Sequence, residues 1–163
     1  LTGEAAAGLL WRRYRVQQTG LKNDLPRPSG SADIKWTASP LTTVKLTALR
    51  KPEESFTAAF YWYNAISATV GQALSRNWHA RLHAQAAFAD YPQEQTLGAV
   101  TARRLDRDLG GGLSLSYKIG PEATWLGATY DITADYAYKR RSSNFGQFSH
   151  RDNRSGASIN ARF

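Results

Sequence analysis

The sequence predicts an all-β fold, an antiparallel up-and-down transmembrane β-barrel in which eight strands are visible. Three observations predict it. Apolar residues recur at every second position, over segments longer than the strands of most soluble proteins. Short turns alternate with longer polar loops, and aromatic residues gather at two levels of the expected strands. These features are typical of strands that cross a bilayer.

Length and composition narrow the class of protein. The chain has 163 residues, which we expect to form a single domain over residues 1–163. No apolar run approaches the ~18 to 20 residues of a membrane-spanning helix, so helical membrane proteins are excluded. The absence of cysteine excludes disulfides and thiolate metal sites. The opening residues, Leu1 to Glu4, show no signal peptide, so either a leader has been removed or the chain is a fragment.

Four strands are expected in the first half of the chain, at residues 4–16, 31–38, 42–51 and 57–72. The first is ambiguous, because either of its faces would carry an arginine. In the second, Ile34 and Trp36 alternate with Asp33 and Lys35, and the third repeats this pattern. The fourth has an apolar face that Asn64 interrupts, for which the sequence offers no explanation.

Four more strands are expected at residues 77–90, 104–119, 124–141 and 153–163. The first of these shows the alternation most clearly. One face would carry Trp78, Ala80, Leu82, Ala84, Ala86 and Phe88, and the other His79, Arg81, His83 and Gln85. A strand separates these two sets completely, whereas a helix would mix them. The remaining three segments repeat the alternation.

Prolines and connection lengths support these boundaries. All six prolines are expected between strands, because proline cannot donate to a ladder: Pro26, Pro28, Pro40, Pro52, Pro92 and Pro121. The connections at 38–41, 74–77 and 120–123 are short, and those at 17–30, 52–56, 91–103 and 142–152 are mostly longer. Outer-membrane barrels have short periplasmic turns. We therefore expect a location in the Gram-negative outer membrane, with both termini periplasmic.

Aromatic residues are expected to form two girdles at the membrane interfaces. Trp36, Trp78 and Trp125 adjoin the short turns, and Trp62, Tyr136 and Tyr138 lie toward the long loops. A soluble all-β fold remains an alternative, but its strands are typically only ~5 to 6 residues long. A β-propeller fits less well, because its repeat signatures are missing.

The end of the chain resembles the C-terminal assembly signal of outer-membrane barrels, in Ala157, Ile159, Ala161 and Phe163. That resemblance implies the barrel-assembly machinery as a partner. The segments Leu41 to Leu46, Leu74 to Leu82, Tyr138 to Asn144 and Arg151 to Phe163 resemble a family of outer-membrane β-barrel porins that accompany bacterial exopolysaccharide and capsule gene clusters. The resemblance implies export or passage of polysaccharide. Members are usually longer, so this chain would correspond to their C-terminal part.

The face opposite the apolar one is expected to point into the lumen and is rich in charge. It would carry Lys35, Lys45, His79, Arg81, His83, Asp108, Lys118, Asp131, Asp135, Lys139, Arg154 and Arg162. In a closed eight-stranded barrel these side chains would fill the interior as an ion-pair network, which suits a structural or adhesive protein without a pore. In a wider barrel they would line a channel whose basic excess favours anions, such as an acidic polysaccharide. Both interpretations stay open.

No catalytic site, metal or cofactor is expected. On a strand, His79 and His83 would lie about 13 Å apart, too far to share one metal. Residues 110–112, three glycines, have no following helix, so a bulge or close side-chain packing is expected there instead of a phosphate loop.

The last long loop is expected to be basic, through Lys139, Arg140, Arg141, His150, Arg151 and Arg154. Contact with outer-membrane lipid, lipopolysaccharide or an anionic polysaccharide is one interpretation, and solvated loop charge is the other. Nucleic acid is not an expected partner, because no recognition fold accompanies the charge.

Overall fold

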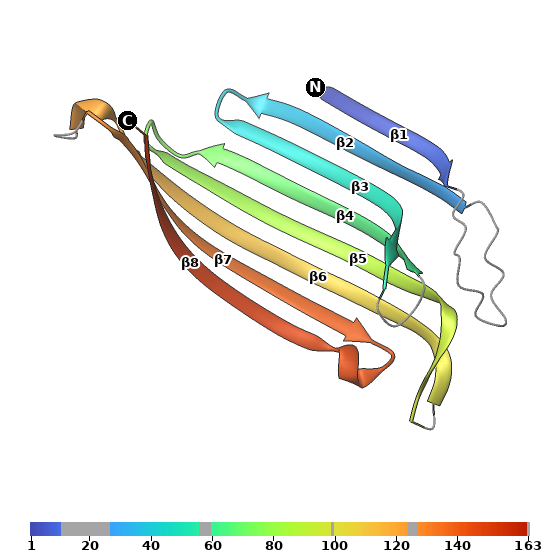
Figure 1. Ribbon diagram of the computed structural model, residues 1–163. Helices are drawn as coiled ribbons and strands as arrows, with labels where there is room; N and C mark the ends of the chain where they lie inside the picture. Colours follow the sequence, from blue (N-terminus) through green and yellow to red (C-terminus); the bar gives the residue numbers. More distant parts are fainter. Residues whose placement is uncertain (11–26, 56–59, 99, 124–126, 163) are drawn as a thin grey trace.

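Eight strands form one antiparallel sheet in the computed structural model, and each pairs with its neighbours in the chain (Figure 1). The structure describes residues 1–10, 27–55, 60–98, 100–123 and 127–162. The strands are β1 (Thr2–Leu10), β2 (Arg27–Ser39), β3 (Thr42–Glu54), β4 (Phe60–Ala73), β5 (Trp78–Leu97), β6 (Val100–Ile119), β7 (Thr129–Ser143) and β8 (His150–Arg162). Two 3-10 helices, η1 (Pro121–Ala123) and η2 (Gly146–Phe148), lie in connections. The predicted all-β, up-and-down arrangement is confirmed.

Helices contribute little to this fold. Among the described residues, no helix is long and apolar enough to cross a membrane.

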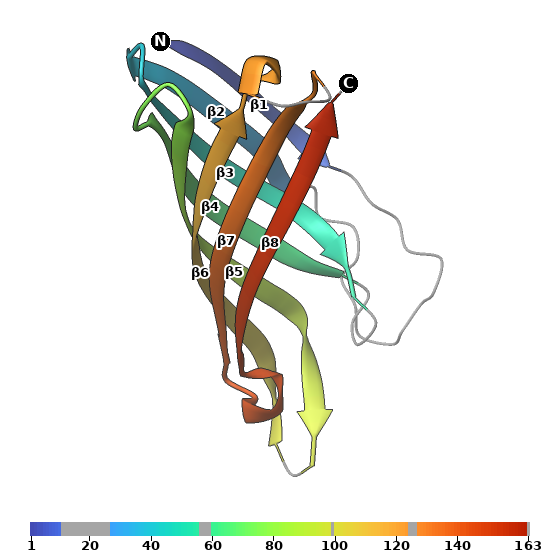
Figure 2. The ribbon, with the colours of Figure 1, turned by 90° about the vertical axis from the view of Figure 1, so that its left-hand side faces the viewer.

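The connections alternate in the expected way between the two ends of the sheet. The turns between β2 and β3 and between β4 and β5, together with η1, lie at one end, where both chain termini also lie (Figure 2). We call this the turn end. The β5–β6 hairpin and η2 lie at the opposite end, which we call the loop end. Which end faces the periplasm stays a prediction.

The expected loop at 91–103 is wrong, because most of it is strand. β5 and β6 each run for 20 residues and meet in a hairpin after Leu97 pairs with Val100. Gly98 makes the turn with φ of 63°, a conformation that glycine adopts without strain. A register shift between Asp90 and Glu94 lets β5 continue past Pro92.

The prediction that every proline lies between strands is also wrong. Pro28, Pro52 and Pro92 lie within β2, β3 and β5, whereas Pro40 and Pro121 lie in connections and Pro26 lies outside the described residues. The pairing of β2 with β3 stops at Gly30 opposite Arg50, so Pro28 and Pro52 each have a single ladder neighbour. Pro28 and Pro52 therefore remove no ladder hydrogen bond on the side where their strand is unpaired. Pro92 lies at the register shift between Asp90 and Glu94, where the regular ladder is interrupted.

The register gives the sheet two chemically distinct faces, because directly opposed residues share a face. One row crosses β2 to β6 as Ala32, Ala48, Ile66, Ala86 and Leu109. The row of the other face crosses β2 to β5 as Lys35, Lys45, Thr69 and His83. We call these the apolar face and the polar face. The described strands alternate between them, and the register shifts at two places, between Thr37 and Ser39 at the end of β2 and between Asp90 and Glu94 in β5.

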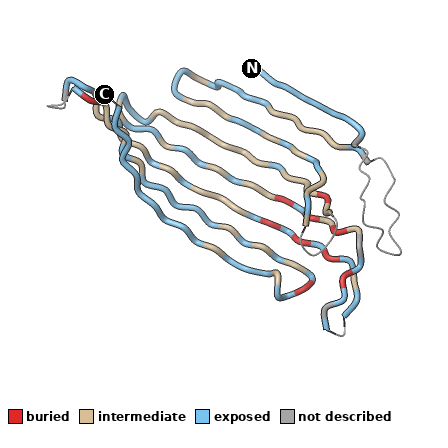
Figure 3. The backbone as a smooth tube through the Cα atoms, viewed as in Figure 1, coloured by how far each residue is buried: buried red, intermediate tan, exposed pale blue. Residues whose placement is uncertain are grey.

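The apolar face is exposed over most of its extent, and no second layer of the described chain packs on it. Its large side chains include Ile66, 59% exposed, and Leu113, 53% exposed. The buried apolar residues are few: Trp62, Ala87, Ala89, Tyr91, Ala128 and Phe145. Burial is concentrated toward the loop end of β4 to β6 (Figure 3). The sheet therefore lacks the second packed layer that stabilises a soluble β fold.

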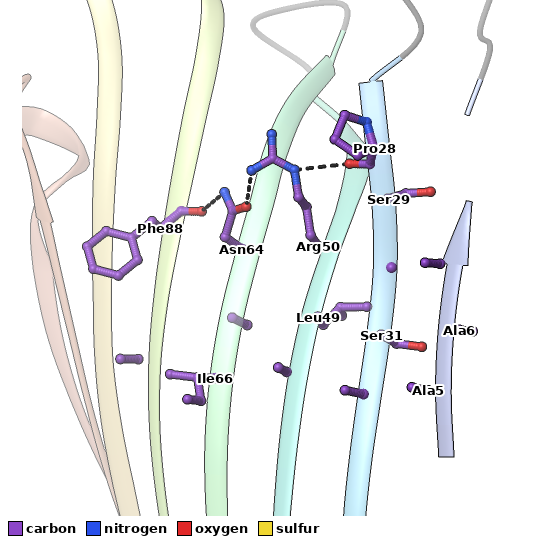
Figure 4. Close-up of a pocket in the computed structure, with 16 residues that line it drawn as sticks. Ala5, Ala6, Pro28, Ser29, Ser31, Leu49, Arg50, Asn64, Ile66 and Phe88 are labelled. Carbon is purple, nitrogen blue, oxygen red and sulfur yellow. Dashed lines mark hydrogen bonds between the residues drawn. The ribbon is translucent and has the colours of Figure 1, made fainter. Parts of the chain in front are cut away.

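Asn64, which interrupts the apolar face of β4, has a specific partner (Figure 4). Its side chain accepts a hydrogen bond from Arg50 Nη1 at 2.9 Å and donates to the Phe88 carbonyl at 3.5 Å. Arg50 Nε also donates to the Pro28 carbonyl at 3.0 Å. The pair lies at the edge of a shallow hollow of about 670 Å³ whose floor is made of alanine and glycine. Hydrogen bonding thus explains the polar interruption.

Closure is the one part of the expected barrel that the sheet does not show. β1 pairs with β2 alone and β8 with β7 alone, so both outer strands have a free edge. The sheet is strongly curled, and β6 to β8 cross in front of β2 to β4 (Figure 2). The described strands therefore form an open, curled sheet and not a closed barrel.

A matched pair of substitutions tests the assignment of the faces. In the full-length protein refolded into lipid vesicles, we expect Leu113→Arg to lower the free energy of unfolding by about 2 to 4 kcal/mol, because it puts a charge into hydrocarbon. The neighbouring Ser114→Arg points to the polar face, opposite Asp135, and should cost less than about 1 kcal/mol. Urea titration of heat-modifiable gel migration measures both. Equal costs would contradict the two-faced sheet.

Candidate functional site

The polar face gathers the charged residues that the sequence singled out. The register places all of the residues expected in the lumen on this face. It adds charged residues that the expected lumen-facing set did not include: Glu4, Asp33, Lys51, Glu53, Arg104, Asp106, Arg141, His150 and Asp152. The sequence could have revealed two of these residues. Arg104 and Asp106 extend, toward the start of β6, the two-residue alternation that was recognised from Asp108 onward.

Charge on the polar face is nearly balanced once these residues are included. Asp33 pairs with Lys45 at 3.1 Å, and Asp152 pairs with Arg154 at 2.8 Å. The predicted basic excess of the lumen-facing set is therefore much reduced.

The first distinct region of the polar face is a packed group at the loop end, formed by Tyr91, Arg104, Asp106, Asp108 and Arg141. We call it the loop-end cluster. Arg104 binds the Asp106 carboxylate at 2.6 to 3.1 Å, and these side chains are only 6% and 1% exposed. Arg141 donates two hydrogen bonds to Asp108, at 2.6 and 2.7 Å. Each buried charge thus has a bidentate counter-charge, which offsets the cost of removing it from water.

Aromatic rings complete the loop-end cluster. The Arg104 guanidinium lies 4.4 Å from the Tyr91 ring centroid and 3.4 Å from that of Phe148 in η2. Tyr61 stacks on Tyr91 with a centroid distance of 4.9 Å. Tyr91 lies three residues beyond Phe88, toward the loop end. Burial raises the pKa of its phenol, although the nearby charge of Arg104 acts to lower this pKa. These contacts tie β4, β5, β6 and η2 together, which is a structural role.

The second distinct region is a polar hollow of about 300 Å³ toward the turn end. Its side chains on the polar face come from four strands: Thr43, Ala73, His79, Arg81, Ser114 and Ser116, around Gly71. Arg81 lies opposite Gly71 and Ser114 in the register, so the missing side chain of Gly71 leaves space beside the guanidinium. No carboxylate is among the described residues that line it. We call this region the cationic hollow. Guanidinium, imidazole and hydroxyl groups together form a donor set for anions.

The two histidines that could suggest a metal site have separate surroundings. The His83 ring lies 3.0 Å from Thr69 Oγ1 and 3.4 Å from Gln85 Oε1. Within the described ranges, no group of three or more His, Asp or Glu residues could hold a metal ion.

The three glycines at 110–112 form no bulge, since the register runs through them on both sides. A side chain at Gly110 would come within 3.2 Å of the Gln85 side chain, and one at Gly112 within 3.0 Å of the Tyr136 carbonyl. Close packing, one of the two expected explanations, therefore accounts for these glycines.

The aromatic residues expected at the membrane interfaces lie mainly on the apolar face. Trp36, Trp78, Tyr136 and Tyr138 are exposed there. Trp62 shares the apolar row of β4 but is 4% exposed, so it is covered by its surroundings. Ala157, Ile159 and Ala161 lie on the apolar face of β8. Trp125 and Phe163 lie outside the described residues.

The expected loop at 142–152 is shorter than predicted, because β7 extends to Ser143 and β8 begins at His150, which places His150 and Arg151 in a strand. Lys139, Arg140 and Arg141 lie within β7, and His150, Arg151 and Arg154 lie within β8. The strand period then divides these residues between the two faces. Only Arg140 and Arg151 lie on the apolar face.

Removing one member of the loop-end cluster tests its structural role. Asp108→Asn leaves the Arg141 guanidinium without its counter-charge, so we expect a loss of about 1 to 3 kcal/mol in the free energy of unfolding. Asp135→Asn, on the same face but exposed, should change it by less than about 0.5 kcal/mol. Urea unfolding of the full-length protein in vesicles compares them. A loss no larger for Asp108→Asn than for Asp135→Asn would show that the cluster does not stabilise the sheet.

Comparison with known proteins agrees with this geometry. Residues 1–163 match the family described as putative beta-barrel porin 2. No curated protein and no solved structure matches the chain. The match confirms the predicted porin resemblance at the level of the family, and it favours the barrel over the soluble all-β alternative. With its up-and-down antiparallel sheet and its full-length match, the chain belongs to the putative beta-barrel porin 2 family.

Proposed function

We propose that this sheet is part of the wall of an outer-membrane β-barrel whose polar face lines a water-filled passage. The observation that carries the proposal is the division of the sheet into an exposed apolar face and a charged polar face. An apolar face of this kind is stable in contact with lipid hydrocarbon, and a charged face is stable in contact with water or a polar solute. Porin family membership and the absence of a second packed layer support this assignment. Passage of a solute, and not a reaction, is the proposed activity.

The free edges of β1 and β8 support a barrel wider than eight strands. An unpaired strand edge cannot be satisfied inside hydrocarbon, so each edge must pair with another strand. We infer that further strands complete the wall. A wider barrel has room for water, whereas a closed eight-stranded barrel is filled by its own side chains.

The length of the strands supports a bilayer crossing. The segment from Trp78 to Phe88 contains about 11 residues, the number that a tilted strand needs to span the hydrocarbon core. In the proposed orientation the turn end and both termini are periplasmic, as in barrels with short periplasmic turns. The loop end then faces the outside of the cell.

An anionic solute, such as an acidic polysaccharide, is the proposed cargo. The cationic hollow supports it, because Arg81 and His79 lie beside hydroxyl groups without a carboxylate in the described lining. The rest of the polar face is nearly balanced in charge, so we expect the hollow to contribute more to selectivity than the face as a whole.

A structural or adhesive barrel without a pore is the second candidate, and the loop-end cluster favours it. There Arg104 and Asp106 are buried by packed aromatic rings, as in a filled interior. If the same packing extended across the whole polar face, no passage would remain.

Planar-bilayer recording of the full-length protein separates the candidates. We expect a stable conductance with a preference for chloride over potassium. Arg81→Glu should lower the chloride-to-potassium permeability ratio by roughly twofold or more, because it reverses the charge of the hollow. Arg76→Glu makes the same charge change in the exposed turn between β4 and β5 and should have the smaller effect.

The outcomes are distinct. Absence of current from correctly folded, membrane-inserted protein would overturn the passage and leave the structural candidate. Equal shifts from Arg81→Glu and Arg76→Glu would keep the passage but remove the cationic hollow as its selective element.

A further inference from the structure

Three arginines form a continuous group on the apolar face near the loop end. Arg140 of β7 lies directly opposite Arg151 of β8. Arg107 of β6 lies opposite Ser142, two residues along β7 from Arg140, so Arg107 and Arg140 are diagonal neighbours about 7 to 8 Å apart. We call Arg107, Arg140 and Arg151 the arginine patch. All three side chains are exposed.

No ion pair within the described residues neutralises the arginine patch. Asp90 of β5 lies on the same face, diagonal to Arg107, but it pairs with Arg103 at 2.9 Å. Two like charges directly opposite each other on neighbouring strands destabilise a sheet. Within the described part of the chain, none of the three guanidinium groups makes an ion pair with a carboxylate. Every acidic residue of β6, β7 and β8 lies on the opposite, polar face: Asp106, Asp108, Asp131, Asp135 and Asp152.

The polar face shows the contrast. Lys139 and Arg141, on either side of Arg140 in the sequence, both reach Asp108, at 3.6 and 2.6 Å. The same basic run therefore supplies paired cations to one face and unpaired cations to the other. An anion from outside the chain would relieve the repulsion between Arg140 and Arg151.

The surroundings of the arginine patch indicate what kind of anion this is. Leu109 lies directly opposite Arg140, and Tyr138 is the next residue along β7 on the same face. The Arg107 guanidinium lies 6.0 Å from the Phe88 ring centroid. Apolar and aromatic side chains thus adjoin the cations on the side toward the middle of the sheet. A ligand that meets both has an acyl part next to an anionic part, which is the structure of a phosphorylated lipid.

Guanidinium is the side-chain group best suited to phosphate, because its planar fork donates paired hydrogen bonds to two phosphate oxygens. A free soluble anion would satisfy the charge but would leave the neighbouring apolar surface uncovered. A polysaccharide without a lipid anchor would do the same.

We propose that Arg107, Arg140 and Arg151 form a binding site for the phosphate groups of lipopolysaccharide in the outer leaflet. The inference rests on the proposed function, because it requires the apolar face to contact lipid and the loop end to face outward. It assigns to the apolar face a specific lipid contact in addition to general solvation by hydrocarbon.

Equilibrium binding of fluorescent lipopolysaccharide to the full-length protein in detergent tests the site. The double variant Arg140→Gln/Arg151→Gln should weaken binding about tenfold or more, because it removes two charged hydrogen-bonding partners of phosphate. The matched control is Lys139→Gln/Arg154→Gln, which removes two charges from the same strands but from the polar face. The control should change the affinity by less than about twofold. Heat-modifiable migration on gels must show that both variants fold.

The ligand is varied as well. Lipopolysaccharide whose phosphates have been removed should bind the wild-type protein as weakly as intact lipopolysaccharide binds the double variant. Inorganic phosphate at millimolar concentration should not displace the lipid, and lipid-free polysaccharide should not bind the arginine patch.

Three results would overturn the site: equal binding by the double variant and the control, phosphate-independent binding of the lipid, or binding of lipid-free polysaccharide that depends on Arg140 and Arg151. Bilayer insertion and conductance are recorded on the same preparations. Normal insertion and current without phosphate-dependent binding would reject the site alone, whereas failure to insert would reject the proposed function.

Discussion

The whole structure depends on an unbroken register across the sheet. Because successive residues of a strand point to opposite faces, a slip of one residue would exchange the two faces of that strand. The ladders between β2 and β8 keep this alternation over long strands. Their two register shifts lie toward strand ends, between Thr37 and Ser39 in β2 and beyond Asp90 in β5. Apolar rows therefore line up with apolar rows, and charged rows with charged rows. Two continuous surfaces of different chemistry result, one apolar and one charged.

This arrangement inverts the usual relation between burial and polarity. Leucine and isoleucine side chains are exposed, whereas Arg104, Asp106 and Asp108 are buried. In water the exposed face would be a liability, but in a bilayer it is the stabilising surface. The buried charges are stable because each has a bidentate partner. The polar face therefore differs between its two ends. Toward the loop end it is filled by packed ion pairs, and toward the turn end it has the open cationic hollow.

Much of the fold could be predicted from sequence, since period-2 alternation from Trp78 to Phe88 is a local property that one strand displays by itself. Pairing partners are not local. Pro92 suggested a loop because nothing in the sequence reveals a register shift. Arg104 lay within the expected strand at 104–119 but was missed, because the alternation was followed only from Asp108 onward. Asn64 is explained only by Arg50 on the neighbouring strand. The cationic hollow likewise exists because Gly71 lies opposite Arg81, a juxtaposition that only the register determines.

Solvent exposure measured along a single strand tests whether the sheet has one face in lipid and the other in water. The natural chain has no cysteine, so single cysteines can be introduced at each position from Leu113 to Lys118 of β6, beyond the closely packed glycines, in the full-length protein. Spin labels at these positions in vesicles report collision with lipid-soluble oxygen and with a water-soluble nickel complex. We predict strict alternation, with odd-numbered positions accessible to oxygen and even-numbered positions accessible to the nickel complex. Equal access of the nickel complex to both sets of positions would contradict a strand with one face in lipid.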